Sequence, residues 1–362
     1  MGMAEVKRLV DGAPVFDLPD DERVLVARPL SEFLKDTVTI EYVVDDMLVR
    51  GYLYSKTGCT GSGKTGVAAV LALAVGIGVK FGPHECNRGP VLYIAGENAA
   101  DVHNRFLVAL EKMKAKVPEN IRVIDRSFLL AHRIDELLVI VESLKPTLII
   151  VDTDQAVALS GGAEENSNAE RMAHARLLRR LTRASSRPTV VDLCHPVKNA
   201  TRDDLVPRGG SAFLNEVDGN LRLWRDGDTV ELVSDPNKFR GAPVTMSFRI
   251  EQVRSERIKD AKGRLIAVPY IVPVSDDEAE HQRRQEWTEE NRLIYAMAGE
   301  PKGSQSDWAR ACQWFHEDGA PAKYKVNRLL KRLEKVNPAL VRQARNGMWT
   351  LTEAGKREAQ RP

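Results

Sequence analysis

Residues 52–75 read YLYSKTGCTGSGKTGVAAVLALAV, and this stretch decides the fold of the chain. Within it, GCTGSGKT at 58–65 satisfies the pattern GxxxxGK[ST] in full. A strand-like segment (52–55) precedes the motif and an apolar helical segment (67–75) follows it, which is the context of a true phosphate-binding loop. The glycines of such a loop let backbone N–H groups converge on phosphate oxygens at a helix N-terminus. The stretch therefore predicts an α/β domain that binds a nucleotide.

Each polar position of this motif has an expected role. Lys64 is expected to reach the β- and γ-phosphates, and the Thr65 hydroxyl to hold Mg²⁺. ATP and Mg²⁺ are therefore the expected cofactors. The predicted phosphate-binding residues are Gly58, Thr60, Gly61, Ser62, Gly63, Lys64 and Thr65.

Three later strand-like runs end on residues that suit the same chemistry. PTLIIVD ends on Asp152, which is expected to act as the Walker B carboxylate of an Mg²⁺ site. VLYIAGE ends on Glu97, which we predict to be the general base for an attacking water, with an acid in the N-cap region of a helix as the alternative. TVVDLCH ends on His195, which would stand beside the phosphates, although a lone histidine is more often structural.

The order of the segments predicts a doubly wound α/β domain over 37–252. Runs such as 148–151 are apolar at every position, as strands buried on both faces of a parallel sheet must be. Asp192 interrupts one such run, so it either has a partner or lies before the strand begins. We also expect an N-terminal arm over 1–36 and, after the α/β domain, a solvated linker of mixed charge and proline over 253–285.

Composition excludes several classes of protein. The 362 residues are 43% hydrophobic and 29% charged, with 53 basic and 51 acidic side chains, so the net charge of +2 identifies no polyanionic partner. No run of 18 apolar residues occurs, and the four scattered cysteines form no CxxC pair. We therefore expect a cytoplasmic protein that does not span a membrane and has neither a disulfide framework nor a cysteine zinc site.

The last segment, 286–362, has a different character, since it holds four of the five tryptophans. It reads as three helices (288–298, 306–315 and 322–335) and a hairpin (340–351) with Asn-Gly at 346–347, a pair preferred in type I′ turns. Between 323 and 345, eight Lys or Arg oppose one Glu. This pattern predicts a winged-helix domain that binds duplex DNA, with docking on an acidic protein as the alternative. The predicted duplex contacts are Lys325, Arg328, Lys331, Arg332, Arg342 and Arg345.

Taken in order, the motifs resemble the RecA-like ATPases, and specifically the RepA-like replicative helicases that plasmids and phages often encode. The matching stretches lie between about residues 40 and 250: GCTGSGKT, VLYIAGENAADVHNR, LIIVDTDQA, LSGGAEENSNAE, LCHPVKNATRDDLVPRGGSAFLNE and DPNKFRGAP. The resemblance implies a RecA-like core, Glu97 as catalytic base, Asp152 as Walker B acid, and His195 as the residue that couples nucleotide state to DNA contacts. The chain departs from the family at Cys59, Asp154 and Asp192.

In related ring-forming helicases, a Lys-x-Arg pair enters the nucleotide site of the neighbouring subunit. Lys238 and Arg240 match that pair, and Arg222 is a competing candidate for the arginine finger. The resemblance thus implies a homo-oligomeric ring, with a hexamer expected. A surface salt bridge is the alternative role for Arg240.

Two loops, 160–168 and 196–211, are expected to face the channel of such a ring. The second loop carries Lys198, Arg202 and Arg208, which would bind the phosphates of single-stranded DNA unless they are only solvated charges. The sequence therefore favours an ATP-dependent DNA helicase or translocase. An ATP-switched DNA-binding regulator and a recombination or loading factor remain alternatives.

Overall fold

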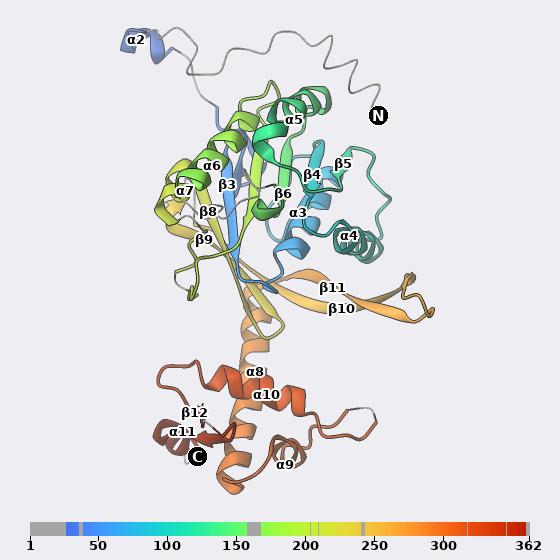
Figure 1. The fold of residues 1–362 in the computed structure, drawn as a ribbon, viewed down its shortest axis with the longest axis vertical. Coiled ribbons are helices and arrows are strands. Elements are labelled where there is room, and N and C mark those ends of the chain that lie inside the picture. Colours follow the sequence, from blue (N-terminus) through green and yellow to red (C-terminus); the bar gives the residue numbers. More distant parts are fainter. Residues whose placement is uncertain are drawn as a thin grey trace. The chain divides into compact units, whose positions relative to one another are not determined.

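The computed structural model describes residues 27–35, 39–157, 168–202, 204–208, 210–239, 243–316, 318–344 and 346–359. Two compact units make up the chain, an N-terminal unit (Met1–Val274) and a C-terminal unit (Ser275–Pro362), and each is described by itself (Figure 1).

A nine-stranded sheet forms the centre of the N-terminal unit, in the order β11-β10-β9-β8-β3-β7-β6-β4-β5. Six strands from β8 to β5 run parallel, with β7 between the phosphate-loop strand β3 and the Walker B strand β6. This arrangement confirms the predicted RecA-like, doubly wound α/β core. The parallel strands are β3 (Leu53–Gly58), β4 (Val91–Ala95), β5 (Ile121–Ile124), β6 (Leu148–Asp152), β7 (Thr189–Cys194) and β8 (Gly219–Asp226).

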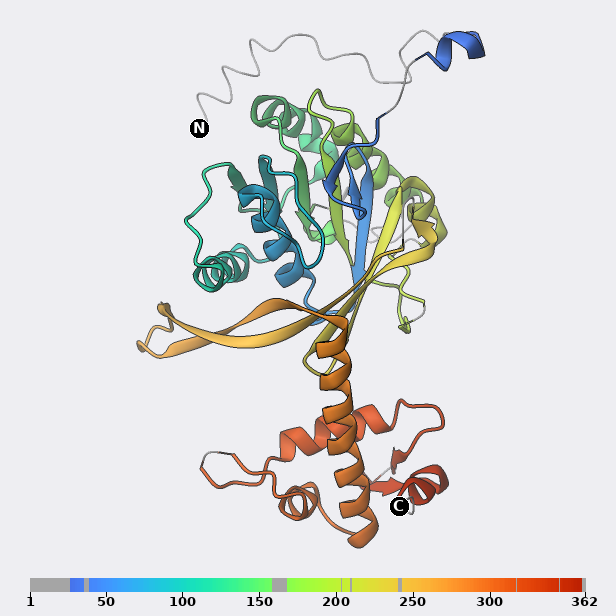
Figure 2. The ribbon, with the colours of Figure 1, turned by 180° about the vertical axis from the view of Figure 1, so that it is seen from behind.

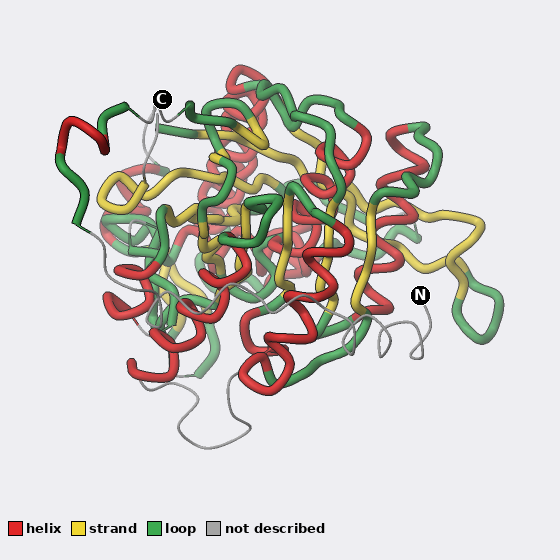
Figure 3. Tube along the Cα trace, turned by 90° about the horizontal axis from the view of Figure 1, so that it is seen from above, coloured by secondary structure: helices red, strands yellow, loops and turns green. Residues whose placement is uncertain are grey.

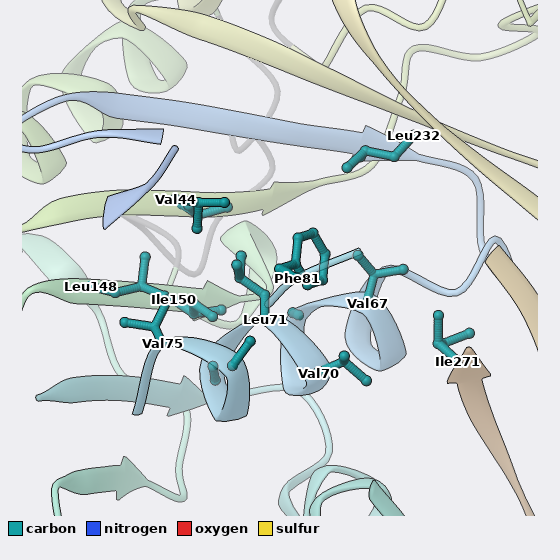
Figure 4. Close-up of a cluster of buried hydrophobic side chains, with 14 of the residues drawn as sticks. Val44, Val67, Val70, Leu71, Val75, Phe81, Leu148, Ile150, Leu232 and Ile271 are labelled. Carbon is teal, nitrogen blue, oxygen red and sulfur yellow. The ribbon is translucent and has the colours of Figure 1, made fainter. Parts of the chain in front are cut away.

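Helices cover both faces of the parallel strands. On one face, α3 (Lys64–Ile77) and α4 (Ala99–Met113) pack in a cluster with Tyr54 and Ile150. Figure 4 shows Ile150 of this cluster with Leu71 and Val75 of α3. On the other face, α5 (Leu130–Leu144), α6 (Asn168–Thr182) and α7 (Gly210–Glu216) pack against Leu53 and Ile149. Successive strand residues thus enter opposite clusters, which is why these runs are apolar at every position. Figure 3 shows the strands in yellow and the helices in red from above.

Three long antiparallel strands extend the sheet beyond β8: β9 (Thr229–Phe239), β10 (Thr245–Lys259) and β11 (Leu265–Val274). The β10–β11 hairpin, orange in Figure 2, packs Ile258 and Val268 against Leu107 and Val108 of α4. Residues 253–274 are therefore strands of the N-terminal unit, and the solvated linker predicted there is wrong. The charged residues at 259–264 that suggested a linker lie at the tip of this hairpin, and those at 276–284 belong to the helix that begins at Asp276.

The remaining elements of the N-terminal unit are short. They are α2 (Leu30–Phe33), β1 (Tyr42–Val44), β2 (Leu48–Val49) and the 3₁₀ turn η1 (Asp154–Val157). Most of the predicted arm 1–36 and of the predicted loop 160–168 lies outside the described residues. Within the described part of the chain, no helix has the length and apolar character that crossing a membrane requires.

The C-terminal unit has its own core around Trp308, Leu330 and Trp349. Its first helix begins twelve residues before the predicted start, at a capping box formed by Ser275 and Glu278. The hairpin loop closes between Ala344 and Met348 (N···O 2.8 Å), so it holds three residues and not the two of a type I′ turn. Its elements are α8 (Asp276–Gly299), α9 (Gln305–Ala311), α10 (Lys323–Leu333), β12 (Val341–Gln343), β13 (Trp349–Leu351) and α11 (Glu353–Glu358).

Candidate active site

The phosphate loop connects β3 to the first turn of α3. Gly61 and Gly63 take φ values of +78° and +93°, a left-handed conformation that glycine adopts without steric cost. The Ser62 hydroxyl is buried inside the loop and has no hydrogen-bond partner among the described residues. A buried polar atom without a partner is costly, so the loop fits an anionic ligand that would supply one.

Lys64 points back into this loop. Its ammonium donates to the carbonyls of Gly58 (2.6 Å) and Cys59 (3.2 Å) and lies 3.5 Å from Nδ1 of His195. Burial lowers the pKa of Lys64, and nearby acidic groups oppose that shift. The lysine is thus held where the loop curls around it, with only 6% of its surface exposed.

Asp152 lies at the C-terminal end of β6, next to the first turn of α3. Its Oδ1 accepts a hydrogen bond from the Thr65 hydroxyl (3.2 Å), and its Oδ2 accepts one from the Tyr93 hydroxyl (2.6 Å). Burial raises the pKa of Asp152, while the Tyr93 hydrogen bond and the charge of Lys56 act against that rise. Carboxylate and hydroxyl oxygens are ligands that Mg²⁺ prefers, so the Asp152–Thr65 pair fits the predicted metal site.

Glu97 stands at the end of β4, the strand that neighbours β6. Its Oε2 accepts a hydrogen bond from Thr153 (3.0 Å), and its backbone N–H donates to the carbonyl of Asp152 (3.3 Å). Asn98 caps α4 instead, since its side chain accepts from the N–H of Asp101. Glu97 directly precedes the cap of that helix, and its carboxylate is exposed.

His195 directly follows β7, between the ends of β3 and β6. Burial, and then the charge of Lys64, lower the pKa of His195, so a neutral imidazole can accept a hydrogen bond from Lys64. The chain turns after His195 into a hairpin-like loop whose base is closed by Val197 N–H to Val206 O (3.0 Å) and Arg208 N–H to His195 O (2.9 Å). We call residues 196–208 the His195 loop.

The predicted DNA contacts of this loop lie at different exposures. Lys198 and Arg202 are exposed, and Arg202 forms an ion pair with Glu231 of β9. Arg208 is half-buried at the base of the loop. Asp203 and Gly209 lie outside the described residues.

The candidates for a site completed by a neighbouring subunit come from β8 and β9. Lys238 is the second-to-last residue of β9, and its ammonium lies 3.5 Å from the carbonyl of Asn215. Arg222 is half-buried on β8. Arg240 lies outside the described residues.

The site contains residues that the sequence did not indicate as functional. Tyr93 and Thr153 hold the two carboxylates, and Lys56, on the phosphate-loop strand, donates to the Lys64 carbonyl (3.1 Å). Burial lowers the pKa of Lys56 to about 7, although Asp152 acts in the opposite direction. The available signals were a phenol inside the apolar run VLYIA and a lysine inside the strand that leads into the phosphate loop, LYSKTG.

Asp192, the acidic residue that interrupts the apolar run of β7, does have a hydrogen-bond partner. It is fully buried and accepts from Nε2 of His174 on α6 (3.2 Å). Burial raises the pKa of Asp192, and His174 opposes the rise. The strand therefore includes Asp192, because α6 supplies the polar group that the buried carboxylate needs.

In the C-terminal unit, α10 uses part of its basic face internally. Lys325 pairs with Glu289 and lies over the Trp314 ring (4.5 Å), and Arg332 pairs with the buried Glu290 (2.9 Å). Among the other predicted duplex contacts, Lys331 and Arg342 are exposed, Arg328 is half-buried, and Arg345 lies outside the described residues.

The fold and this site define a P-loop ATPase domain of the RecA-like α/β class. Its diagnostic features are the glycine loop on α3, the carboxylate at the end of β6, and a strand between the two. Comparison with family models agrees, since residues 23–201 match the family described as an AAA domain. That range includes Lys64, Glu97, Asp152 and His195. No curated protein matches the chain.

Proposed function

We propose that this protein is an ATP- and Mg²⁺-dependent DNA translocase or helicase of RepA-like type that works as a ring, with a hexamer expected. One observation carries the proposal: His195, within 3.5 Å of the phosphate-loop lysine, is also the residue from which an exposed basic loop begins. A change at the nucleotide would therefore be transmitted to the base of the loop that carries Lys198 and Arg202.

Hydrolysis would be shared among five side chains. Glu97 would accept the proton of the attacking water, Lys64 would neutralise charge on the β- and γ-phosphates, and His195 would stand near the terminal phosphate. Thr65 and Asp152 would hold Mg²⁺, which would neutralise developing phosphate charge when bound. Thr153 and Tyr93 would keep the two carboxylates in place through the hydrogen bonds described above.

A neighbouring subunit would complete the site with Lys238 and Arg240, as the resemblance implies. An arginine supplied in this way is worth about 10³ to 10⁵ in rate, so hydrolysis would depend on assembly. We expect Arg240→Ala to abolish hydrolysis and to spare ATP binding. Near-normal turnover in that variant would contradict the role of Arg240 and would direct attention to Arg222.

Single-stranded DNA would bind in the channel along the His195 loops. Each subunit offers Lys198, Arg202 and Arg208, and cations repeated around a ring suit a phosphate backbone. Arg202 would have to exchange Glu231 for a phosphate, which is feasible because 54% of the Arg202 side chain is exposed.

The C-terminal unit would act as a winged helix on duplex DNA. Three helices followed by a hairpin have the order of that motif, and α10 would enter the major groove. Lys331 of α10 and Arg342 of the hairpin are the exposed cations that support this role. Lys325 and Arg332 would serve mainly to fix α10 against α8, because both are paired with α8 carboxylates.

The test is the ATPase rate with and without single-stranded DNA, combined with the native mass. Wild type should be stimulated by single-stranded DNA and form a ring-sized oligomer. Lys64→Ala should lose ATP hydrolysis, whereas Lys80→Ala, at an exposed lysine, should behave as wild type. A monomer without DNA stimulation would overturn the proposal. Salt-dependent binding to one duplex sequence without that stimulation would favour the ATP-switched regulator.

A further inference from the structure

A buried ion pair joins α6 to the segment that follows the Walker B strand. The carboxylate of Asp154 is fully buried, the guanidinium of Arg171 is 6% exposed, and the two are in direct contact. Burying two charges costs several kcal/mol in desolvation, and apolar residues of the same size often stabilise a fold as well or better. The pair therefore calls for a reason beyond stability.

Arg171 also contacts the His195 loop. Its Nε donates to the carbonyl of Arg208 (3.2 Å), and its guanidinium lies 5.2 Å from the centre of the Phe213 ring on α7. Arginine can make these contacts at once because its planar group carries five donors in a fixed fork. A lysine lacks this planar fork, and an apolar residue has no donor for the carboxylate or the carbonyl.

The two segments that Arg171 joins are both parts of the nucleotide site. On one side, Asp154 lies two residues after Asp152, and the intervening Thr153 donates to Glu97. On the other side, the N–H of Arg208 donates to the carbonyl of His195. Arg171 is thus bonded to the end of the Walker B segment and to the base of the His195 loop.

Two other ionisable groups near this pair lie on β7. Asp192 on β7 is held by His174 of α6, and the buried Cys194 thiol faces Asp192. Burial raises the pKa of the Cys194 thiol well above its usual range, so it stays neutral. Lys64 also interacts electrostatically with Asp154, and Arg171 is the cation in direct contact with it.

We propose that Arg171 is a positioning residue that couples the Walker B segment to the His195 loop, so that DNA bound at the loop accelerates hydrolysis and nucleotide state changes DNA affinity. This inference rests on the proposed function, because it needs DNA at that loop. It assigns the coupling to a residue that touches neither ATP nor DNA. The partner of Arg171 is Asp154, one of the positions at which the sequence departs from the family that it resembles.

The experiment measures ATPase kinetics of the full chain with and without an oligodeoxythymidine strand. Arg171→Lys keeps a charge near Asp154 and loses the fork. The double variant Asp154→Asn/Arg171→Met removes both buried charges together, because Arg171→Met alone would leave the carboxylate unpaired. Arg176→Met, on the same helix with 62% of its side chain exposed, is the matched control.

We expect both Arg171 variants to keep kcat and KM without DNA within about twofold of wild type. Their stimulation by DNA should fall about tenfold, within the range usual for coupling between two sites. Arg176→Met should keep full stimulation. Thermal unfolding of each variant identifies any general loss of structure, and the Arg171→Lys variant retains the charge balance if the double variant does not fold.

The outcomes separate the two proposals. If wild type itself shows no stimulation by DNA, the proposed function fails. If DNA stimulates both Arg171 variants as strongly as it stimulates wild type, only the coupling role is overturned. Equal loss of basal and stimulated rates would also overturn it, because that pattern indicates a structural role alone.

Discussion

Replacing Lys56 with methionine should stabilise the chain. Lys56 lies on β3 behind the phosphate loop with 1% of its surface exposed, and its Nζ donates to the Lys64 carbonyl (3.1 Å). Burial lowers its pKa from 10.5 to about 7. A lysine whose pKa falls on folding destabilises the folded chain, because folding disfavours the protonated form that the unfolded chain prefers.

The magnitude follows from that shift. One pKa unit corresponds to about 1.4 kcal/mol, so lowering the pKa of Lys56 from 10.5 to about 7 costs the folded state roughly 4–5 kcal/mol at and below pH 7. Loss of the hydrogen bond to the Lys64 carbonyl offsets about 1 kcal/mol of the stability gained in the variant. Lys56→Met should therefore raise the free energy of unfolding by about 3 kcal/mol at pH 7.

The sign of the pH dependence is a second, independent part of the prediction. The cost of Lys56 is complete below pH 7 and declines as pH rises toward 10.5, because the folded chain has then lost the proton and the unfolded chain begins to lose it. The advantage of the variant should shrink over the same interval and vanish near its upper end.

Urea unfolding followed by circular dichroism from about pH 6 to about pH 10 would measure both effects. Comparing wild type with variant at each pH cancels the titration of groups that do not interact with Lys56. Lys116→Met, at an exposed lysine after α4, is the control and should change little. Equal stabilities, or a difference that does not change with pH, would refute the reasoning.

Two further predictions concern the loop and the C-terminal unit. Gly63→Ala should weaken ATP binding in calorimetry and cost roughly 1–3 kcal/mol of stability, because alanine at φ +93° is strained although its methyl group has room. An unchanged affinity for ATP would mean that the loop backbone adjusts to accommodate alanine, and would contradict the prediction. Trp308→Ala should destabilise the C-terminal unit by about 3–5 kcal/mol, since the indole is 1% exposed and its N–H donates to Glu300. Tryptophan fluorescence should then show unfolding of the C-terminal unit at a lower urea concentration. An unchanged midpoint would contradict the prediction.

Local signals in the sequence determined the core and the phosphate loop. The glycines and Lys64 are neighbours in the chain, so the motif specifies their geometry without help from the rest of the fold. Asp152, Glu97 and His195 could be brought together because parallel strands end at the same edge of a sheet. The ends of the apolar runs, together with the phosphate-loop motif, therefore predicted which residues meet there.

Contacts between distant segments were decided only by the tertiary structure. No local pattern indicates that Asp154 meets Arg171, that Asp192 meets His174, or that 253–274 folds back along α4. The basic face of α10 was visible in the sequence, but its pairing with α8 carboxylates was not. Hydrophobic periodicity reports which side of an element is buried, and the partner of a buried charge depends on the packing of the whole domain.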